Sequence, residues 1–254
     1  MAEALIGGII KAKVVSPRMI LASDILPERL DYLKKTYKIE VTGSNQKAAD
    51  FAGIIILAVK PQVLPEVCSR LRVKRKTLII SIAAGFGLAR LQKLFPENPV
   101  MRVMPNNPAL VGAGISALSS GDKVEEKDLD KVNRIFKSVG EVVKVQEKLM
   151  DAVTGLSGSG PAFIYLLVEA MVEAGEKLGL NKGDAEKLSA QTVLGSAQTL
   201  LKTKKTPREL REMVTSPGGT TLSGLRVLLD RKANEALTEA VIAAAKRAAE
   251  LSQS

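Results

Sequence analysis

Hydrophobic and polar positions follow two different patterns along the chain, and the change falls near residue 150. Before it, short apolar runs alternate with segments of helical spacing, which is typical of a doubly wound, Rossmann-like α/β sheet. The expected domains are therefore 1–148 and 149–254. The predicted strands are Met19–Ala22, Ile39–Thr42, Gly53–Val59, Leu78–Ile82, Val100–Met104 and Glu141–Val145, and the predicted helices between them are Pro27–Tyr37, Gln62–Leu71 and Leu88–Phe95.

Helical spacing dominates the second half. Phe163, Leu167 and Ala174 share one face of a helix whose other faces are also largely apolar, so we expect that helix to be buried on most sides. The last helix repeats Leu237, Val241 and later apolar residues at steps of three and four. A self-contained bundle is one interpretation. Burial against a second copy of the chain is the favoured one, because about 100 residues offer little core of their own.

The amino-acid composition limits the kinds of catalysis, metal site and partner that the chain can have. The 254 residues include no His and a single Cys, Cys68, which excludes imidazole catalysis, an intrachain disulfide and a cysteine-rich metal site, so no metal is expected. The net charge of +10 suits anionic substrates and phosphorylated cofactors, but the basic clusters carry no interleaved aromatics, and we expect no nucleic-acid partner. No uninterrupted apolar run approaches the ~20 residues of a membrane helix, and no signal peptide is visible, so a cytoplasmic protein without a membrane partner is expected.

The strongest local signal is the run Thr215–Thr221, which enters a predicted helix ending near Asp230. Gly218 and Gly219 leave backbone N–H groups open to a ligand, and the following helix N-terminus attracts an anion. The hydroxyls of Ser216, Thr220 and Thr221 complete a cradle that suits a carboxylate. A glycine turn with a Ser/Thr cap is the alternative interpretation.

Loops that follow the predicted strands are the second candidate site, because ligands of open α/β sheets bind at the carboxyl ends of strands. Asp24 suits a ribose hydroxyl, whereas Ser23 and Arg29 suit a 2′-phosphate; a plain turn role for Asp24 is the alternative. A third candidate, Gly155–Pro161, either passes close to a cofactor or forms a hinge. The strand-end residues expected to contact a cofactor are Ser23, Asp24, Ala58, Val59, Lys60, Pro61, Ala83, Ala84, Gly85, Met104, Pro105 and Asn106.

The run Met213–Asp230 resembles the signature of pyrroline-5-carboxylate reductases. Four further motifs match the family in the same order, and together they span almost the whole chain: Ala58-Val-Lys-Pro61, Arg102-Val-Met-Pro-Asn106, Gly155-Leu-Ser-Gly-Ser-Gly-Pro-Ala162 and Ala190-Gln-Thr-Val-Leu-Gly195.

This resemblance implies reduction of 1-pyrroline-5-carboxylate to proline with NADPH or NADH, NADPH being slightly favoured, as the last step of proline synthesis. It also implies a helical domain that interlocks into dimers, often five of them in a decamer. Carried over by position, the loop Ser216–Thr221 holds the substrate carboxylate, the Thr221 hydroxyl contacts the ring nitrogen, and Asn45 joins the strand-end loops around the cofactor.

The N-terminus departs from the family pattern. Family members begin with a strand and a Gly-x-Gly-x-x-Ala turn, whereas Met1–Leu5 lies inside that motif, with Ala2 at its last position. We therefore expect a truncated form, from a start codon assigned too late, whose sheet has a vacant or rearranged centre and whose first helix is exposed. Two alternatives to this reductase stay open: another two-domain dehydrogenase, and a non-enzymatic chain that binds no cofactor and acts only through assembly or as a basic nucleic-acid binder.

Overall fold

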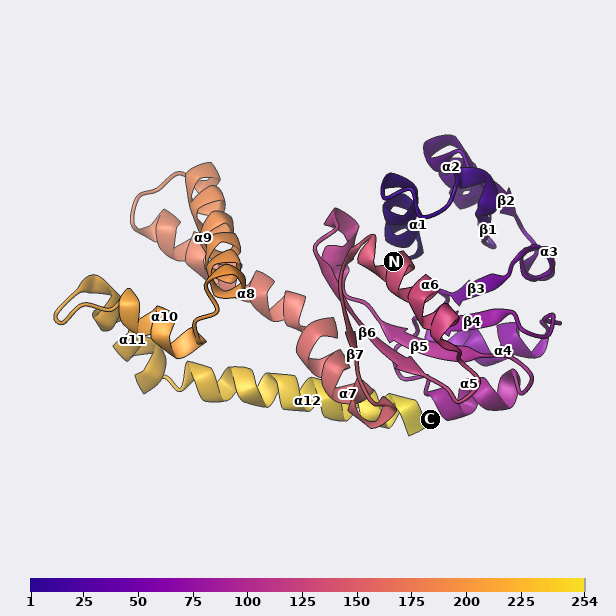
Figure 1. The fold of residues 1–254 in the computed structure, drawn as a ribbon. Helices are drawn as coiled ribbons and strands as arrows, with labels where there is room; N and C mark the ends of the chain where they lie inside the picture. Colours follow the sequence, from indigo (N-terminus) through magenta and orange to yellow (C-terminus); the bar gives the residue numbers. More distant parts are fainter. Residues whose placement is uncertain (254) are drawn as a thin grey trace. The chain divides into compact units, whose positions relative to one another are not determined.

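The computed structural model describes residues 1–253, which divide into two compact units (Figure 1). Unit 1 comprises Met1–Ser159 together with the described residues from Ile242 onward, and unit 2 comprises Gly160–Val241. The last helix, α12 (Ala233–Gln253), therefore begins in unit 2 and ends in unit 1.

Unit 1 is built on two separate β-sheets. The larger sheet has the order β3-β4-β5-β6-β7, in which β3, β4 and β5 are parallel, β6 is antiparallel to β5, and β7 is parallel to β6. The strands β1 and β2 form a parallel pair of their own. The bounds are β1 (Leu21–Ser23), β2 (Glu40–Thr42), β3 (Ile54–Leu57), β4 (Leu78–Ser81), β5 (Val100–Met104), β6 (Gly114–Ser120) and β7 (Gly140–Lys144).

The division into two sheets agrees with the expectation of a sheet whose centre is vacant or rearranged. The accompanying expectation of an exposed first helix is wrong. Helix α1 (Ala2–Lys11) buries Leu5 and Ile9 in the same core cluster as Met101 of β5 and Phe136. The apolar side of α1 packs into this core because α1 lies on the same face of the sheet as α6 (Glu126–Lys137).

Helices cover both faces of the larger sheet (Figure 1). On one face, Ile80 and Met101 pack with residues of α1 and α6. On the other, Ile79 and Val100 pack with α4 (Leu64–Ser69) and α5 (Leu88–Leu94). Successive strand residues alternate between these two cores, as the pleat requires, so the strands are apolar throughout.

Several elements differ from the sequence predictions. The predicted helix 62–71 is a 3₁₀ turn, η2 (Pro61–Val63), followed by α4. Strand β6 was not predicted, because its run Gly-Ile-Ser-Ala-Leu-Ser-Ser mixes small polar residues with apolar ones. The remaining helices of unit 1 are α2 (Pro27–Tyr37), α3 (Asn45–Phe51), α7 (Met150–Val153) and the 3₁₀ turns η1 (Pro17–Met19), η3 (Asn107–Val111) and η4 (Glu147–Leu149), with the π-helical turn η5 (Thr154–Gly158).

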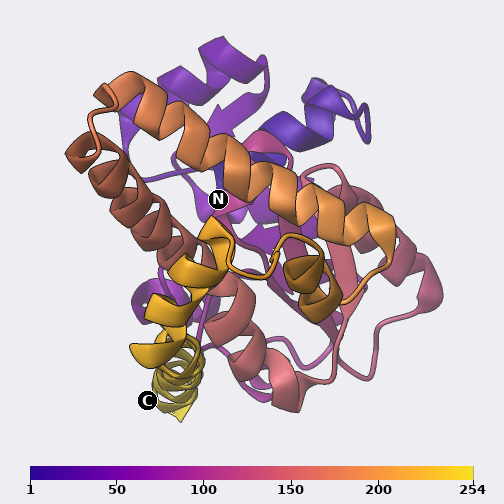
Figure 2. The ribbon, with the colours of Figure 1, turned by 90° about the vertical axis from the view of Figure 1, so that its left-hand side faces the viewer.

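Unit 2 is entirely helical among its described residues. Helices α8 (Gly160–Lys177) and α9 (Lys182–Thr203) form a helical hairpin (Figure 2). Gly175 permits their close approach, since a Cβ there would lie 3.1 Å from the Cβ of Ala185. Helices α10 (Pro207–Met213) and α11 (Thr220–Asp230) follow.

Within the single chain α8 has no buried residue, so the expected burial of this helix is not found inside one copy. The apolar side chains of α8, such as Leu166 at 66% exposed, lack a partner surface within the chain because unit 2 is too small to enclose them. Burial against a second copy, the favoured interpretation, stays a prediction. One stretch, Glu147–Lys177, is by length and composition apolar enough to cross a membrane, a feature that counting uninterrupted apolar runs had missed.

Candidate active site

The end of β1 brings two predicted cofactor residues together. The Ser23 hydroxyl donates to the Asn45 side-chain oxygen at 2.7 Å, and Asn45 begins α3 directly after its cap residue Ser44. The Asp24 carboxylate accepts the backbone N–H of Leu26 at 3.0 Å, which is the turn role left open by the sequence. Ser23 and Asn45 thus place polar side chains on the rim of the β1–β2 pair.

Arg29, the alternative ligand for a 2′-phosphate, pairs with a carboxylate in this structure. Its guanidinium donates to Glu3 of α1 and lies 5.1 Å from the ring centre of Tyr32. The hydroxyls of Tyr32 and Tyr37 also donate to Glu3, at 2.8 and 3.0 Å. Glu3 therefore ties the first turn of α1 to α2, and Arg29 is held at a fixed place beside β1.

We expect the Glu3 cluster to make stability pH-dependent. The hydrogen bond from Arg29 holds the pKa of Glu3 below its ordinary value of 4.5. A depressed folded pKa contributes stability that is fully present above the unfolded pKa and is lost as pH falls through the folded pKa. Urea unfolding should therefore find Glu3→Gln less stable than wild type at neutral pH, and the difference should shrink below about pH 4. The exposed Glu40→Gln is the control; a Glu3→Gln difference that stays constant with pH would contradict this expectation.

The loops after β3 and β4 place small residues at the carboxyl edge of the larger sheet. Ala58 is exposed and Val59 is half-buried. Lys60 is the cap residue of η2, which begins at Pro61. After β4, Ala83 and Gly85 are buried and Ala84 is half-buried. Gly85 has φ +68°, a conformation that favours glycine, and a Cβ there would lie 3.0 Å from the Cβ of Leu251.

Asn106 joins the end of β5 to the π-helical turn η5. Its amide nitrogen donates to the Ser157 carbonyl at 3.1 Å, and its amide oxygen accepts the Ile115 N–H at 2.9 Å. Gly158 lies close to the end of the Met104 side chain, since a Cβ there would lie 2.7 Å from the Met104 methyl carbon. Pro105 is buried. The side chain of Asn106 therefore holds the segment from which α8 starts, a contact that its strand-end position did not predict.

In unit 2, the predicted cradle is a tight turn that leads directly into α11. The Gly219 N–H donates to the Ser216 carbonyl at 3.0 Å, with Pro217 second and Gly218 third in the turn, and Gly218 has φ +72°. These are the features of a type II turn. Gly219 is the N-cap residue, where no side chain accepts from the helix N–H groups.

Threonines occupy the first turn of this helix. Thr220 and Thr221 are the first two residues of α11, and both are exposed in the chain, as is Ser216. The first N–H groups of a helix lack intrahelical acceptors and carry partial positive charge. The turn and the first residues of α11 thus combine backbone donors with hydroxyls, as binding of a carboxylate requires.

A buried ion pair was missed by sequence reasoning. Arg102 of β5 is 3% exposed, and its Nη1 donates to the Glu147 carboxylate at 2.9 Å. The signal available in the sequence was an arginine within an apolar strand, which requires a buried partner. Its partner lies 45 residues away and could not be identified from spacing.

No metal centre or further site emerges from the part of the chain that the structure describes. No three His, Cys, Asp or Glu side chains cluster there in a way that could hold a metal ion.

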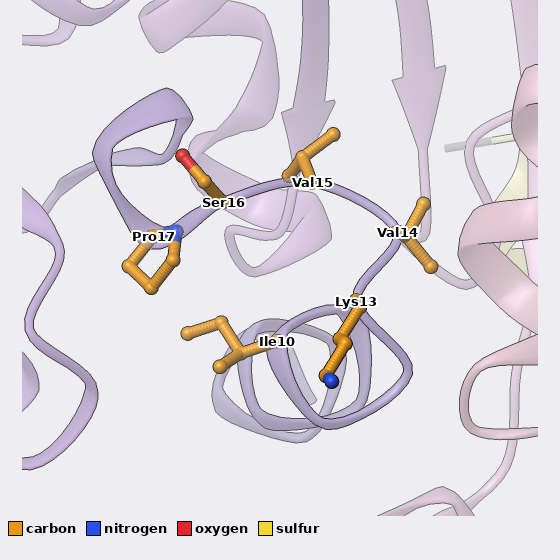
Figure 3. Close-up of a pocket in the computed structure, with 6 residues that line it drawn as sticks. All are labelled: Ile10, Lys13, Val14, Val15, Ser16 and Pro17. Atoms are coloured by element: carbon orange, nitrogen blue, oxygen red, sulfur yellow. The ribbon is translucent and has the colours of Figure 1, made fainter.

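An open pocket of about 510 Å³ lies between the end of α1 and the segment before η1 (Figure 3). Its lining is Ile10, Lys13, Val14, Val15, Ser16 and Pro17, none of them a predicted site residue.

Two family models match different parts of the chain. The model of pyrroline-5-carboxylate reductase dimerisation matches residues 147–251. The model described as NADP oxidoreductase coenzyme F420-dependent matches residues 1–85. The first match includes the turn at Gly219 and α8, and the second includes the loops after β1, β3 and β4.

Similar proteins extend the likeness over the whole chain. A pyrroline-5-carboxylate reductase of Synechocystis is 46% identical over 99% of this chain and 94% of its own length. The corresponding protein of Methanosarcina acetivorans is 43% identical over 99% of this chain and 94% of its own length.

Solved structures agree with these sequences. The pyrroline-5-carboxylate reductase of Coxiella burnetii has a TM-score of 0.91 at 36% identity, covering 100% of this chain and 95% of that one. The Plasmodium falciparum pyrroline carboxylate reductase, with NADP bound, has a TM-score of 0.89 at 32% identity, covering 98% and 94%. The turn at Ser216–Gly219 and the small residues after β3 and β4 agree with these full-length relatives. This chain belongs to the pyrroline-5-carboxylate reductase family.

Proposed function

We propose that this chain reduces 1-pyrroline-5-carboxylate to L-proline with NADPH or NADH as hydride donor. The observation that carries the proposal is the Ser216–Gly219 turn at the start of α11, whose two threonines present hydroxyls beside free helix N–H groups. Its setting within a chain that resembles reductases of this name from end to end supports the same substrate.

The substrate carboxylate is bound, in this proposal, by the turn and the first residues of α11. The backbone N–H groups of Gly218 and of the first residues of α11 donate to its oxygens, and the hydroxyls of Ser216 and Thr220 add further donors. The positive end of the helix dipole favours the negative charge at this place. Binding the carboxylate fixes the orientation of the ring and brings the imine bond to a defined position.

Thr221 acts on the ring nitrogen. Its hydroxyl hydrogen-bonds that nitrogen and helps orient the imine, which reacts most readily when protonated. Reduction adds a hydride to the imine carbon and leaves the proton on nitrogen, so no alkoxide forms. Positioning and modest polarisation can therefore suffice in a chain without histidine.

The residues after the strands fit a dinucleotide. Bound there, the dinucleotide supplies the hydride. Ser23 and Asn45 offer a hydroxyl and an amide at the end of β1, and the small side chains of Ala58 and Ala84, exposed and half-buried, leave room for a ligand beside the backbone. The full proposed set is Ser23, Asp24, Asn45, Ala58, Val59, Lys60, Pro61, Ala83, Ala84, Gly85, Met104, Pro105 and Asn106.

We also propose the wider setting of this activity. Residues 1–148 form the dinucleotide-binding domain, and residues 149–254 form the dimerisation and substrate-binding domain. The exposed apolar side chains of α8 and α12 support burial against a second copy, and five such dimers assemble into a decamer. The enzyme works in the cytoplasm, without a membrane or nucleic-acid partner.

The test is a steady-state assay with the purified chain. Reduced nicotinamide absorbance should fall when 1-pyrroline-5-carboxylate is added to NADPH or NADH, and proline should form in equal amount. Prephenate with NAD⁺, and a set of 2-hydroxy acids with either oxidised dinucleotide, serve as controls for other two-domain dehydrogenases. If the enzyme turns over one of the control substrates and not the cyclic imine, the proposed substrate is wrong.

A further inference from the structure

A buried charge cluster lies beneath the strand-end loop of β4, in unit 1. Arg102 of β5 points to the α5 side of the sheet, where its Nη1 donates to Glu147 Oε1 at 2.9 Å. Its Nη2 lies 3.6 Å from Asp151 Oδ1. The Arg102 side chain is 3% exposed, so the two carboxylates compensate a cation that water does not reach.

Glu147 also caps a helix that cannot cap itself. Helix α5 begins after Gly87, which has no side chain to accept from the first N–H groups. The Leu88 N–H instead donates to Glu147 Oε1 at 3.0 Å, from a residue 59 positions later in the chain. One carboxylate oxygen therefore receives both the Arg102 guanidinium and the start of α5, which fixes the end of the loop Ala83–Gly87.

The other end of that loop is covered by the last turns of α12. Leu251 packs on Gly85, so that a Cβ on the glycine would lie 3.0 Å from the Leu251 Cβ and 3.3 Å from its carbonyl oxygen. The Ser252 hydroxyl donates to Asp151 Oδ1 at 3.2 Å, which connects the same turn to the charge cluster. The loop is thus held by two segments that follow it by more than 50 residues.

We propose that Glu147 is a positioning residue for cofactor binding. It holds the loop Ala83–Gly87 in the arrangement that receives the dinucleotide, and Asp151 with the end of α12 supports the same arrangement from the other side. This inference rests on the proposed function, because Ala83, Ala84 and Gly85 are part of the proposed dinucleotide site. Glu147 itself touches neither reactant.

The expected effect is confined to cofactor affinity. Without the cap, the loop also adopts conformations that do not bind the dinucleotide. The apparent affinity for NADPH then falls in proportion to the fraction of molecules whose loop is in the binding-competent conformation. The substrate-binding turn and Thr221 belong to unit 2, so we expect the KM for the cyclic imine to stay unchanged. A general loss of folding would instead change every kinetic parameter together.

The experiment compares Glu147→Ala and Glu147→Gln with wild type. Glutamine keeps an oxygen that accepts from both Leu88 and Arg102, whereas alanine keeps neither contact. We expect Glu147→Ala to raise the KM for NADPH about fivefold with kcat and the KM for 1-pyrroline-5-carboxylate unchanged, and Glu147→Gln to restore the wild-type value. Glu97→Ala, which breaks an exposed ion pair with Arg75, is the matched control and should change nothing.

Hydrogen exchange provides a readout that does not depend on turnover. Peptides covering residues 83–90 should exchange faster in Glu147→Ala than in wild type or Glu147→Gln, while peptides from α9 stay unchanged. Should Glu147→Ala fail to fold because Arg102 is left unpaired, the double variant Arg102→Met/Glu147→Met removes the cap without leaving a buried charge, and the same two effects are expected of it.

The outcomes separate this inference from the proposed function. A wild-type enzyme that turns over normally, together with an unchanged KM for NADPH in the variant that lacks the cap, overturns the role of Glu147. A wild-type enzyme with no reductase activity overturns the proposed function, and the exchange of residues 83–90 then decides on Glu147 alone: unchanged exchange overturns the inference, and faster exchange supports the part of it that does not depend on activity, the hold of Glu147 on the loop.

Discussion

Replacing Gly219 by valine should raise the KM for 1-pyrroline-5-carboxylate about a hundredfold while leaving the chain folded. A Cβ at this position would lie 2.4 Å from the Ser216 hydroxyl oxygen and 3.2 Å from the Ser216 carbonyl oxygen. The Ser216 hydroxyl has to rotate away and the Ser216 carbonyl has to shift slightly, and the branched valine side chain then crowds the place of the carboxylate. Hydrogen bonds to a charged group contribute ~1.5–3 kcal/mol each, so loss of one or two gives a change of this size.

Gly224→Ala is the matched control for this experiment. Gly224 lies in the same helix, and nothing lies within 4 Å of a Cβ added there. Alanine should therefore leave the KM unchanged and favour the helix by roughly 0.5–1 kcal/mol. Steady-state kinetics and circular dichroism of both variants make the comparison. A folded Gly219→Val enzyme with the wild-type KM would exclude the turn from substrate binding.

Replacing Thr221 by valine should lower kcat/KM for the cyclic imine at least about tenfold. Valine matches threonine in shape but has no hydroxyl to interact with the ring nitrogen. The lost hydrogen bond to a group that carries charge is worth ~1.5–3 kcal/mol, which corresponds to a factor of about ten to a hundred in rate. Thr221 is exposed, so we expect its replacement by valine to leave the fold intact.

Two further variants make the Thr221 result specific. Thr221→Ser retains the hydroxyl and should recover most of the activity. Thr203→Val removes a threonine hydroxyl that donates only to the Thr199 carbonyl at 2.8 Å, and it should behave as wild type. Equal activity of Thr221→Val and wild type would remove this hydroxyl from the mechanism.

The strands of the larger sheet were predictable because both faces of the sheet are buried. Ile79 and Ile80 point to different cores, so the strand reads as one apolar run whose identity does not depend on alternation. Strand β6 gave no such signal, since Ser116 and Ser119 are buried within it. Their burial follows from neighbouring strands that no local pattern reveals.

The residues of the proposed site also fall into a group that the sequence predicts and a group that it does not. The glycines and threonines of residues 216–221 could be recognised because a turn followed by a helix is a local arrangement. The contacts of Asn106 with Ser157 and of Glu147 with Leu88 join residues 51 and 59 positions apart. Such pairs depend on the tertiary fold, and from one sequence the only hint was the charge of Arg102 inside an apolar strand.

The return of α12 to unit 1 has a consequence for the biosynthesis of this protein. Leu251 and Ser252 supply the cover of the loop at Gly85, yet they are synthesised after the whole of unit 2. Domains of many proteins fold one after another as they emerge. Here unit 1 contains residues from both sides of unit 2 in the sequence, so its packing around Gly85 is completed only after the helical unit has been synthesised.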